Sequence, residues 1–295
     1  MIDFTDRVAI VTGAGAGLGR SHALGLAARG ARVVVNDMGA GADDVAAEIE
    51  AAGGRAWAHR ADVSDTEAVA DMIAQAHAKW GRIDILINNA GILRDKTFAK
   101  MDMADFRKVV DVHLIGSANC CHAVWPIMRN QGYGRIVLTA SGSGLYGNFG
   151  QANYGAAKAA MVGLMNVLHL EGARDDIRIN TLAPTAATAM TEGLLPQAAL
   201  ALLAPETITP GVLYLASENG PSRTILSAGG GTFAVTQIRE TQGTLIKGEI
   251  TPEAVEAAWN DITDNTEAQD LENAFAQTRK YALRAAQAEG ITLDW

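Results

Sequence analysis

Short runs of β-branched residues alternate with longer helix-forming stretches over residues 1 to about 235, and this alternation constrains the fold more than any other feature. The apolar runs are residues 8–11, 33–35, 83–87 and 135–138. Each is too short and too continuously apolar for a surface strand or a long helix. The helix-forming stretches between them include residues 18–29, 43–52 and 66–80. Strand–helix–strand units with short links predict right-handed crossovers and a doubly wound parallel α/β sheet of the Rossmann type.

Residues 236–295 differ in character and are predicted to form a C-terminal helical extension to a domain of residues 1–235. Thr251, Pro252 and Glu253 are typical of a helix start, and a second helix is expected over about 267–289. Its apolar stripe comprises Leu271, Ala274, Phe275, Tyr281, Ala282 and Ala285. A stripe of this kind must pack against its own domain or against a neighbouring subunit, and the sequence leaves both open.

Composition excludes several classes of protein. With 295 residues, of which 48% are hydrophobic, the chain can bury a large core, and a formal net charge of −9 argues against a broad nucleic-acid or anionic-membrane surface. The only cysteines, Cys120 and Cys121, are adjacent, which fits a reducing compartment rather than a disulfide framework. No apolar run reaches the length of a membrane span, and the N-terminus lacks the pattern of a signal peptide. We therefore expect a cytoplasmic protein with no membrane or nucleic-acid partner.

A glycine-rich turn follows the first expected strand and directly precedes a helix. It reads Thr12-Gly13-Ala14-Gly15-Ala16-Gly17-Leu18-Gly19, which lets the backbone approach a pyrophosphate while the helix start attracts the anion. Glycines also serve ordinary turns, but this position favours a dinucleotide. Asp37 ends the next strand, where a carboxylate can bind the adenosine ribose and repel the extra phosphate of NADP. No Arg or Lys occupies positions 36–42, so NAD is the predicted cofactor.

Tyr154 and Lys158 stand four residues apart in an expected helix that runs through Leu170, and therefore share one helix face. An ammonium group and the positive ring of an oxidised nicotinamide would together favour the phenolate, so Tyr154 could exchange a proton with a substrate alcohol. Ser141 follows the strand at 135–138, where ligands gather in open α/β sheets, and Ser143 is the alternative. A serine beside glycine is also a common turn residue.

Five groups of residues together resemble the short-chain dehydrogenase/reductase family over roughly residues 5–232. They are Thr12, Gly13, Gly17 and Gly19; Asp62-Val63; Asn88-Asn89-Ala90-Gly91; Ser141, Tyr154 and Lys158; and Pro184 with Thr188. The resemblance implies that Asp62 and Val63 contact adenine, and that Pro184 and Thr188 lie in a loop that closes over the cofactor. It also implies a catalytic Ser, Tyr and Lys, and a homodimer or homotetramer.

The sequence departs from the family pattern at two positions. His113 stands where the family commonly has an Asn that helps hold the Lys, so His113 is a candidate member of the proton relay. Thr185 replaces the glycine that usually follows Pro184.

The sequence also resembles a narrower group, the (3R)-hydroxyacyl-CoA dehydrogenase domains of peroxisomal multifunctional β-oxidation enzymes and their bacterial single-domain relatives. The residues that carry this likeness are 91–95, 112–114, 135–158 and 251–255. It implies an acyl-CoA thioester substrate, with a 17β-hydroxysteroid or a 3-oxoacyl group as alternatives.

Other functions are less well supported. The six histidines show no metal-ligand spacing, no Gly-x-Ser-x-Gly elbow surrounds Ser141, and no Gly-Lys-Ser/Thr follows the glycines, so a metal site, an esterase and a phosphate-loop NTPase are not expected. Residues 185–205 are the expected substrate lid. The rival from another class is an NAD-binding regulatory protein that has kept the fold and lost the chemistry.

Overall fold

The computed structural model describes residues 1–187 and 196–294. The chain divides into two compact units, Met1–Thr236 and Gln237–Trp295. Among the described residues, no helix has both the length and the apolar composition that crossing a membrane requires.

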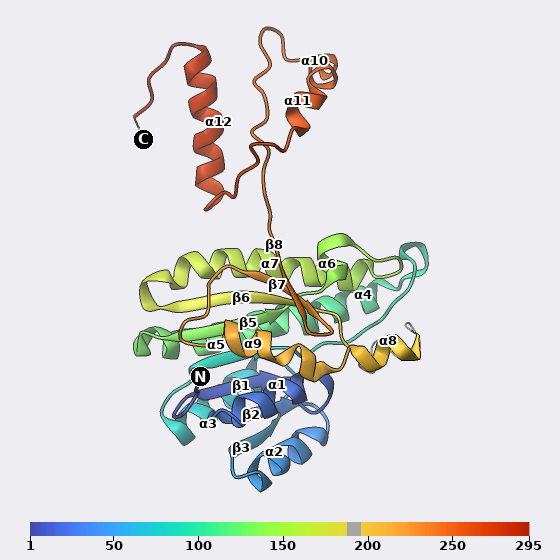
Figure 1. Cartoon of the computed structure of the whole chain (residues 1–295), viewed down its shortest axis with the longest axis vertical. Coiled ribbons are helices and arrows are strands. Elements are labelled where there is room, and N and C mark those ends of the chain that lie inside the picture. Colours follow the sequence, from blue (N-terminus) through green and yellow to red (C-terminus); the bar gives the residue numbers. More distant parts are fainter. Residues whose placement is uncertain (188–195, 295) are drawn as a thin grey trace. The chain divides into compact units, whose positions relative to one another are not determined.

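The first unit is built on one sheet whose described strands lie in the order β3-β2-β1-β4-β5-β6-β7-β8 (Figure 1). The strands are β1 (Val8–Thr12), β2 (Arg32–Asp37), β3 (Arg55–Arg60), β4 (Ile85–Asn88), β5 (Gly134–Thr139), β6 (Ile177–Pro184), β7 (Ile225–Gly229) and β8 (Thr232–Thr236). Strands β1 to β7 pair in parallel, which confirms the predicted Rossmann-type sheet. The order reverses between β1 and β4, the place where ligands bind in such sheets.

The edge strand β8 departs from the expected all-parallel arrangement, because it pairs with β7 in antiparallel register. Gly230 and Gly231 link the two strands and have φ values of 55° and 76°. Two successive residues with positive φ form the tight turn that a two-residue hairpin needs, and glycine adopts that conformation without strain. A hairpin therefore replaces a further crossover at this edge.

Helices cover both faces of the sheet (Figure 1). Those of the first unit are α1 (Gly17–Ala27), α2 (Gly41–Ala51), α3 (Thr66–Trp80), α4 (Met103–Val110), α5 (Gly116–Gln131), α6 (Gly142–Tyr146), α7 (Ala152–Gly172), α8 (Gln197–Leu202) and α9 (Thr209–Leu215). Short helical turns lie at η1 (Phe98–Lys100), η2 (Asp111–Ile115), η3 (Ala173–Asp175) and η4 (Pro205–Thr207). The expected helices at 18–29, 43–52 and 66–80 match α1, α2 and α3 to within two residues at each end.

Alternate residues of the strands feed two separate cores. Ala9 and Val11 of β1 pack with α1, α2 and α9, whereas Val8 and Ile10 of the same strand pack with α3, α5 and α7. Burial on both faces explains why these strands are continuously apolar.

The second unit contains α10 (Pro252–Ala257), α11 (Trp259–Thr263) and α12 (Ala274–Ala288). The expected start at Thr251 is present, since its hydroxyl accepts a hydrogen bond from the Ala254 N–H at 3.2 Å. The long helix begins later than the expected residue 267, because the Asn273 side chain caps it by accepting from the Ala276 N–H.

Most of the predicted apolar stripe of the last helix is exposed within the second unit, so its packing against a neighbouring subunit stays a prediction. Phe275 and Tyr281 are 61% and 52% exposed, and Ala286 is the buried residue of α12. Lys280 and Arg284 instead hold this helix to its own unit, donating hydrogen bonds to the backbone carbonyls of residues 241–243. Carbonyl groups of an irregular segment need such donors, and an apolar stripe cannot supply them.

Candidate functional site

The predicted site residues gather at the carboxyl ends of consecutive strands. Thr12 and Asp37 end β1 and β2, residues 62–63 follow β3, and residues 89–91 follow β4. Ser141 comes two residues after β5, and Pro184 is the last residue of β6. The parallel register of these strands brings all six positions to one edge of the sheet, the usual ligand-binding edge of an open α/β fold.

The glycine turn is tightly packed, and no side chain fits at two of its glycines. A Cβ atom at Gly13 would lie 2.7 Å from the Ala90 Cα, and one at Gly19 would collide with the Gly13 carbonyl oxygen. Gly13 and Gly17 also have positive φ values, 62° and 53°. No side chain caps the start of α1, and no acidic residue lies in its first turn, so its N–H groups are free of any capping side chain. Such a helix start attracts a pyrophosphate.

Thr12 and Asn89 fix the turn against the end of β4. The Thr12 hydroxyl accepts hydrogen bonds from the N–H groups of Asn89 and Ala90, both at 3.0 Å. The Asn89 side chain donates in return to the carbonyls of Thr12 and Gly13 at 3.0 and 3.1 Å. The two predicted cofactor segments therefore form one rigid body.

Two carboxylates lie along the same edge. Asp37 accepts hydrogen bonds from the N–H groups of Gly15 and Gly39, each at 3.0 Å. Asp62 accepts from the backbone and hydroxyl of Ser64 and lies 3.6 Å from the Lys108 ammonium. Burial alone would raise the pKa of Asp62, but the Ser64 hydrogen bonds and the Lys108 charge outweigh it and lower the pKa.

Ser141, Tyr154 and Lys158 come together beside this edge. The Ser141 side chain caps α6, and α7 begins with Ala152, so Tyr154 lies in its first turn and Lys158 one turn later. The Lys158 Nζ lies 5.6 Å from the centroid of the Tyr154 ring and donates a hydrogen bond to the Thr139 carbonyl at 2.6 Å. The three side chains occupy one compartment.

Burial dominates the acid–base properties of this group in the protein alone. It raises the pKa of Tyr154, although a hydrogen bond with Ser141 acts in the opposite direction. It also lowers the pKa of Lys158 to about 7. The Tyr–Lys pair therefore does not produce a phenolate by itself near neutral pH, and a further positive charge is needed.

His113 lies in the same compartment, on the π-helical turn η2 that connects α4 to α5. Its ring is edge-on to the Tyr154 ring, with centroids 5.2 Å apart, and its Nε2 lies 2.8 Å from the Ile92 carbonyl. A Cβ on Gly91 would collide with the imidazole, which explains the glycine. Burial, followed by the Lys158 charge, lowers the pKa of His113 to about 3, so the ring is neutral.

The contacts of a buried glutamine, Gln151, which was not singled out from the sequence, distinguish the roles of the two candidate serines. The Gln151 Oε1 accepts a hydrogen bond from the Ser143 hydroxyl at 2.7 Å, and its Nε2 donates to Asp95 at the same distance. The Ser143 hydroxyl is thus engaged away from Tyr154, whereas Ser141 contacts the phenol. A polar residue just before an expected helix was the only sequence signal for Gln151, and nothing local indicated Asp95 as its partner.

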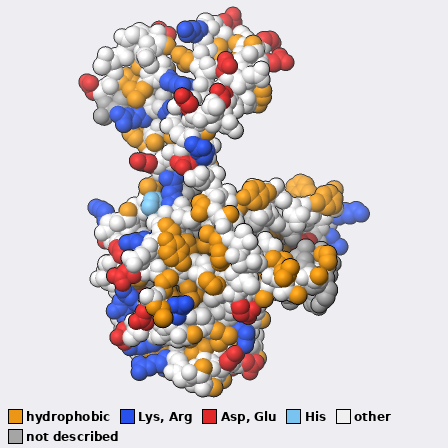
Figure 2. Space-filling model, in the orientation of Figure 1, with side chains coloured by type: hydrophobic (Ala, Val, Ile, Leu, Met, Phe, Trp, Pro, Cys, Tyr) orange, Lys and Arg blue, Asp and Glu red, His pale blue; other side chains and the backbone are white. Residues whose placement is uncertain are grey.

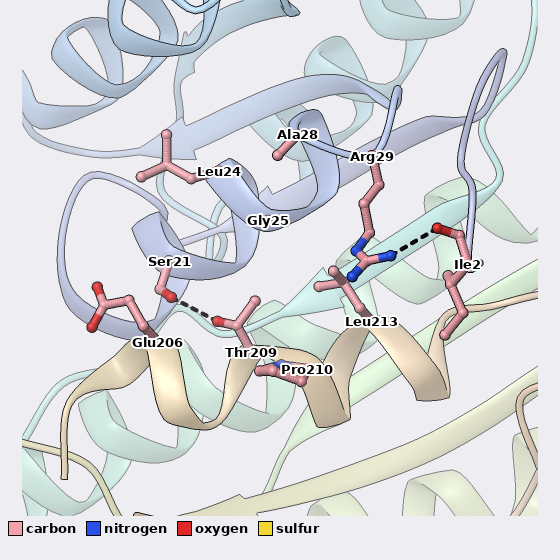
Figure 3. Close-up of a pocket in the computed structure, with 10 residues that line it drawn as sticks. All are labelled: Ile2, Ser21, Leu24, Gly25, Ala28, Arg29, Glu206, Thr209, Pro210 and Leu213. Carbon is pink, nitrogen blue, oxygen red and sulfur yellow. Dashed lines mark hydrogen bonds between the residues drawn. The ribbon is translucent and has the colours of Figure 1, made fainter. Parts of the chain in front are cut away.

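A cavity of about 500 Å³ lies elsewhere, between α1 and α9 (Figure 3). The hydroxyls of Ser21 and Thr209 that line it are bonded to each other at 2.6 Å, and the Arg29 guanidinium donates to the Ile2 carbonyl. No predicted site residue lines it. We therefore assign it to the packing of α1 on α9. Thr188 and residues 188–195 of the expected lid lie outside the described residues.

The site and the fold define a class of protein. A model of the short chain dehydrogenase family matches residues 7–198, and the chain belongs to that family of NAD(P)-dependent oxidoreductases.

The chain is also similar to individual proteins of known sequence or structure. Peroxisomal multifunctional enzyme type 2 of Drosophila melanogaster is 45% identical over 285 residues, covering 91% of this chain and 47% of the relative. The short-chain type dehydrogenase/reductase Rv0148 of Mycobacterium tuberculosis is 45% identical over 270 residues, covering 88% of this chain and 94% of the relative. The solved structure of the full-length Drosophila enzyme superposes with a TM-score of 0.85 at 39% identity, covering 97% of this chain and 50% of that one.

The chain thus spans about half the length, or less, of the multifunctional relatives that it matches. The expected subgroup likeness is confirmed.

Proposed function

We propose that this protein is an NAD-dependent dehydrogenase that acts on a 3-hydroxyacyl-CoA thioester. The observation that carries the proposal is the convergence of Ser141, Tyr154 and Lys158 in one compartment, at the same sheet edge as a glycine turn built for a dinucleotide. A regulatory protein that had lost the chemistry would have no use for this set.

Each residue has a distinct role in the proposed reaction. A nicotinamide cofactor, held by the glycine turn, would supply the hydride-transfer chemistry. The Ser141 hydroxyl holds the substrate oxygen, and the Tyr154 phenol takes the proton of the substrate alcohol or gives it back. Lys158 binds the cofactor ribose and, when protonated, adds to the positive charge that the nicotinamide places beside Tyr154.

We assign His113 a positioning role within this reaction. Its neutral ring is fixed by the backbone of Ile92 and packs against Tyr154, so it orients the phenol. With a pKa lowered to about 3, it is a poor carrier of protons at neutral pH.

NAD is preferred over NADP in this proposal because of Asp37. Its carboxylate faces the N–H group of Gly15 in the glycine turn, and residues 36–42 contain no Lys or Arg. A 2′-phosphate placed there would meet a negative charge without a compensating cation.

The thioester substrate is supported by the motifs shared with the hydroxyacyl-CoA subgroup. A cytoplasmic location and a homodimer or homotetramer remain predictions from the sequence and the family. The names of the multifunctional relatives, which contain the word peroxisomal, give another location for those proteins.

The test is an assay that follows NADH absorbance with 3-hydroxybutyryl-CoA and with a 17β-hydroxysteroid, each with NAD and with NADP. We expect turnover of the CoA thioester with NAD. Tyr154→Phe is expected to lower kcat by at least about 10²-fold, because it removes the proton donor, while NADH still binds. Turnover of the steroid alone would replace the substrate assignment, and NADH binding without turnover of any alcohol would support a silent regulatory protein instead.

A further inference from the structure

The segment between β4 and the end of α4 is basic in an otherwise acidic chain. Residues 94–108 contain five Lys or Arg and three Asp, whereas the formal net charge of the whole chain is −9. In Figure 2, Lys and Arg side chains lie at the outer end of the projection on the right, where Figure 1 places the loop between β4 and α4 beside α6.

Some of these cations are engaged and others are not. The Arg94 guanidinium lies 3.6 Å from Asp105, and the Lys108 ammonium lies 3.6 Å from Asp62. Lys96, Lys100 and Arg107 are exposed, and no acidic side chain among the described residues forms an ion pair with them. Three cations are therefore available to an anion from outside.

Two exposed aromatic rings accompany these cations. Phe98 lies between Lys96 and Lys100 in the chain and is 69% exposed, and Phe149 is 89% exposed. The Lys96 N–H donates to the Gly150 carbonyl at 2.9 Å, so the loop that carries Phe149 lies beside Lys96. We call Lys96, Phe98, Lys100 and Phe149 the rim.

The rim is tied to the start of the catalytic helix. The Asn153 side chain donates a hydrogen bond to the Arg94 carbonyl at 2.9 Å and also accepts one from the Tyr154 N–H at 2.7 Å. Gln151, just before α7, is bonded to Asp95. Two side chains thus hold the basic segment against the first turn of α7, next to Tyr154 but outside its buried compartment.

We propose that the rim binds the phosphorylated adenosine end of a coenzyme A thioester while its acyl group reaches Tyr154. This inference rests on the proposed function and adds where the substrate's nucleotide is held. Phosphate oxygens pair well with Lys and Arg, and an exposed ring offers a stacking surface for adenine. The pantetheine arm separates the thioester from the phosphates, so these groups fall outside the reacting compartment, where the rim lies. The pyrophosphate of NAD is already assigned to the glycine turn.

The test compares two substrates with the same acyl group. Acetoacetyl-CoA carries the nucleotide, and the N-acetylcysteamine thioester of acetoacetate lacks it. In the NADH-dependent reduction by the full chain, Lys96→Ala/Lys100→Ala is expected to raise the KM for acetoacetyl-CoA at least about tenfold, with kcat changed less than about twofold. The kinetic constants for the N-acetylcysteamine thioester and the KM for NADH should not change. Raising KCl from about 50 to about 300 mM should raise the KM for acetoacetyl-CoA in the unmodified protein more than in the variant.

The matched control is Lys79→Ala/Arg174→Ala, which removes the same charge. Lys79 is in the last turn of α3, just before β4, and Arg174 is in η3, just before β6. Both residues therefore lie toward the opposite sheet edge, and the control variant should leave the kinetics of both substrates unchanged.

Phe98→Ala should raise the KM for acetoacetyl-CoA alone. Equal changes for both thioesters, a changed KM for NADH, or no change at all would overturn the rim assignment while the proposed function stood. If the unmodified protein reduced neither thioester, the proposed function would fail and this inference with it.

Discussion

At the scale of single residues, burial sets the protonation of the groups around Tyr154. In the protein alone, the pKa of Lys158 is lowered to about 7 and that of Tyr154 is raised. At neutral pH the phenol is therefore uncharged, and the amine is only partly protonated. A positive charge placed beside the phenol lowers its pKa, and an oxidised nicotinamide carries one. Proton transfer by Tyr154 is therefore expected to depend on the cofactor being bound, rather than on Lys158 alone.

The choice between the two serines gives a prediction at this scale. Ser141→Ala removes the hydroxyl that contacts Tyr154 and is expected to lower kcat by about 10²- to 10³-fold, the usual cost of one oxyanion donor. Ser143→Ala removes a hydroxyl that is already bonded to Gln151, and kcat should fall less than about tenfold. Steady-state kinetics of the two purified variants decide this, and a larger loss for Ser143→Ala would reverse the assignment.

At the scale of elements, the glycine turn between β1 and α1 allows a matched pair of substitutions. Gly19→Ala places a Cβ against the Gly13 carbonyl, so the turn must shift and NADH affinity should fall at least about tenfold. Gly163→Ala makes the same chemical change at an exposed position of α7, where no protein atom other than those of its chain neighbours and the helix's own backbone lies within 4 Å of the added Cβ. It should leave NADH affinity unchanged and raise stability by about 0.5–1 kcal/mol. Fluorescence titration and thermal unfolding measure both, and equal affinities would show that the turn does not hold the cofactor.

The elements that sequence patterns predicted best are those with one clear physical cause. Strands β1, β2, β4 and β5 are apolar on both faces, and α3 has an Asp65 cap, a regular apolar face and a terminal Gly81 with φ of 76°. Strand β3 has no continuous apolar run, because it is an edge strand that is only partly buried and begins with the exposed Arg55. The antiparallel β8 depends on a two-glycine turn that resembles many others.

Side-chain partners far apart in the chain were harder to predict than the strand ends. The carboxyl-edge positions, such as Asp37 and Ser141, follow from strand order alone. The bond between Gln151 and Asp95 joins residues 56 apart in the chain, and the π-helical turn that carries His113 depends on how α4 and α5 pack. No local pattern specifies either of them.

At the scale of the whole molecule, the first unit holds a second buried, neutral histidine, which lies on α1, in addition to the one beside Tyr154. His22 is completely buried, and its Nδ1 lies 2.9 Å from the Thr209 hydroxyl, which also bonds Ser21. These contacts join the helix of the glycine turn to α9. Burial lowers the pKa of His22 to about 3 and, with the Lys158 charge, that of His113 to a similar value, against 6.5 for an ordinary histidine.

This difference predicts how stability depends on pH. Between about pH 6.5 and pH 3 the unfolded chain binds these two protons and the folded chain does not, so the free energy of unfolding rises with pH across that window and falls on acidification. Each histidine contributes a slope of up to about 1.4 kcal/mol per pH unit.

His22→Gln should therefore flatten the fall in unfolding free energy between about pH 7.5 and pH 5 by about 2 kcal/mol. Urea unfolding at several pH values measures the slope separately from any loss of overall stability that the substitution causes. The control is His77→Gln, which changes an exposed histidine and should leave the slope as it is. If His22→Gln and His77→Gln gave parallel curves, His22 would not be the buried neutral group that the packing of α1 against α9 requires.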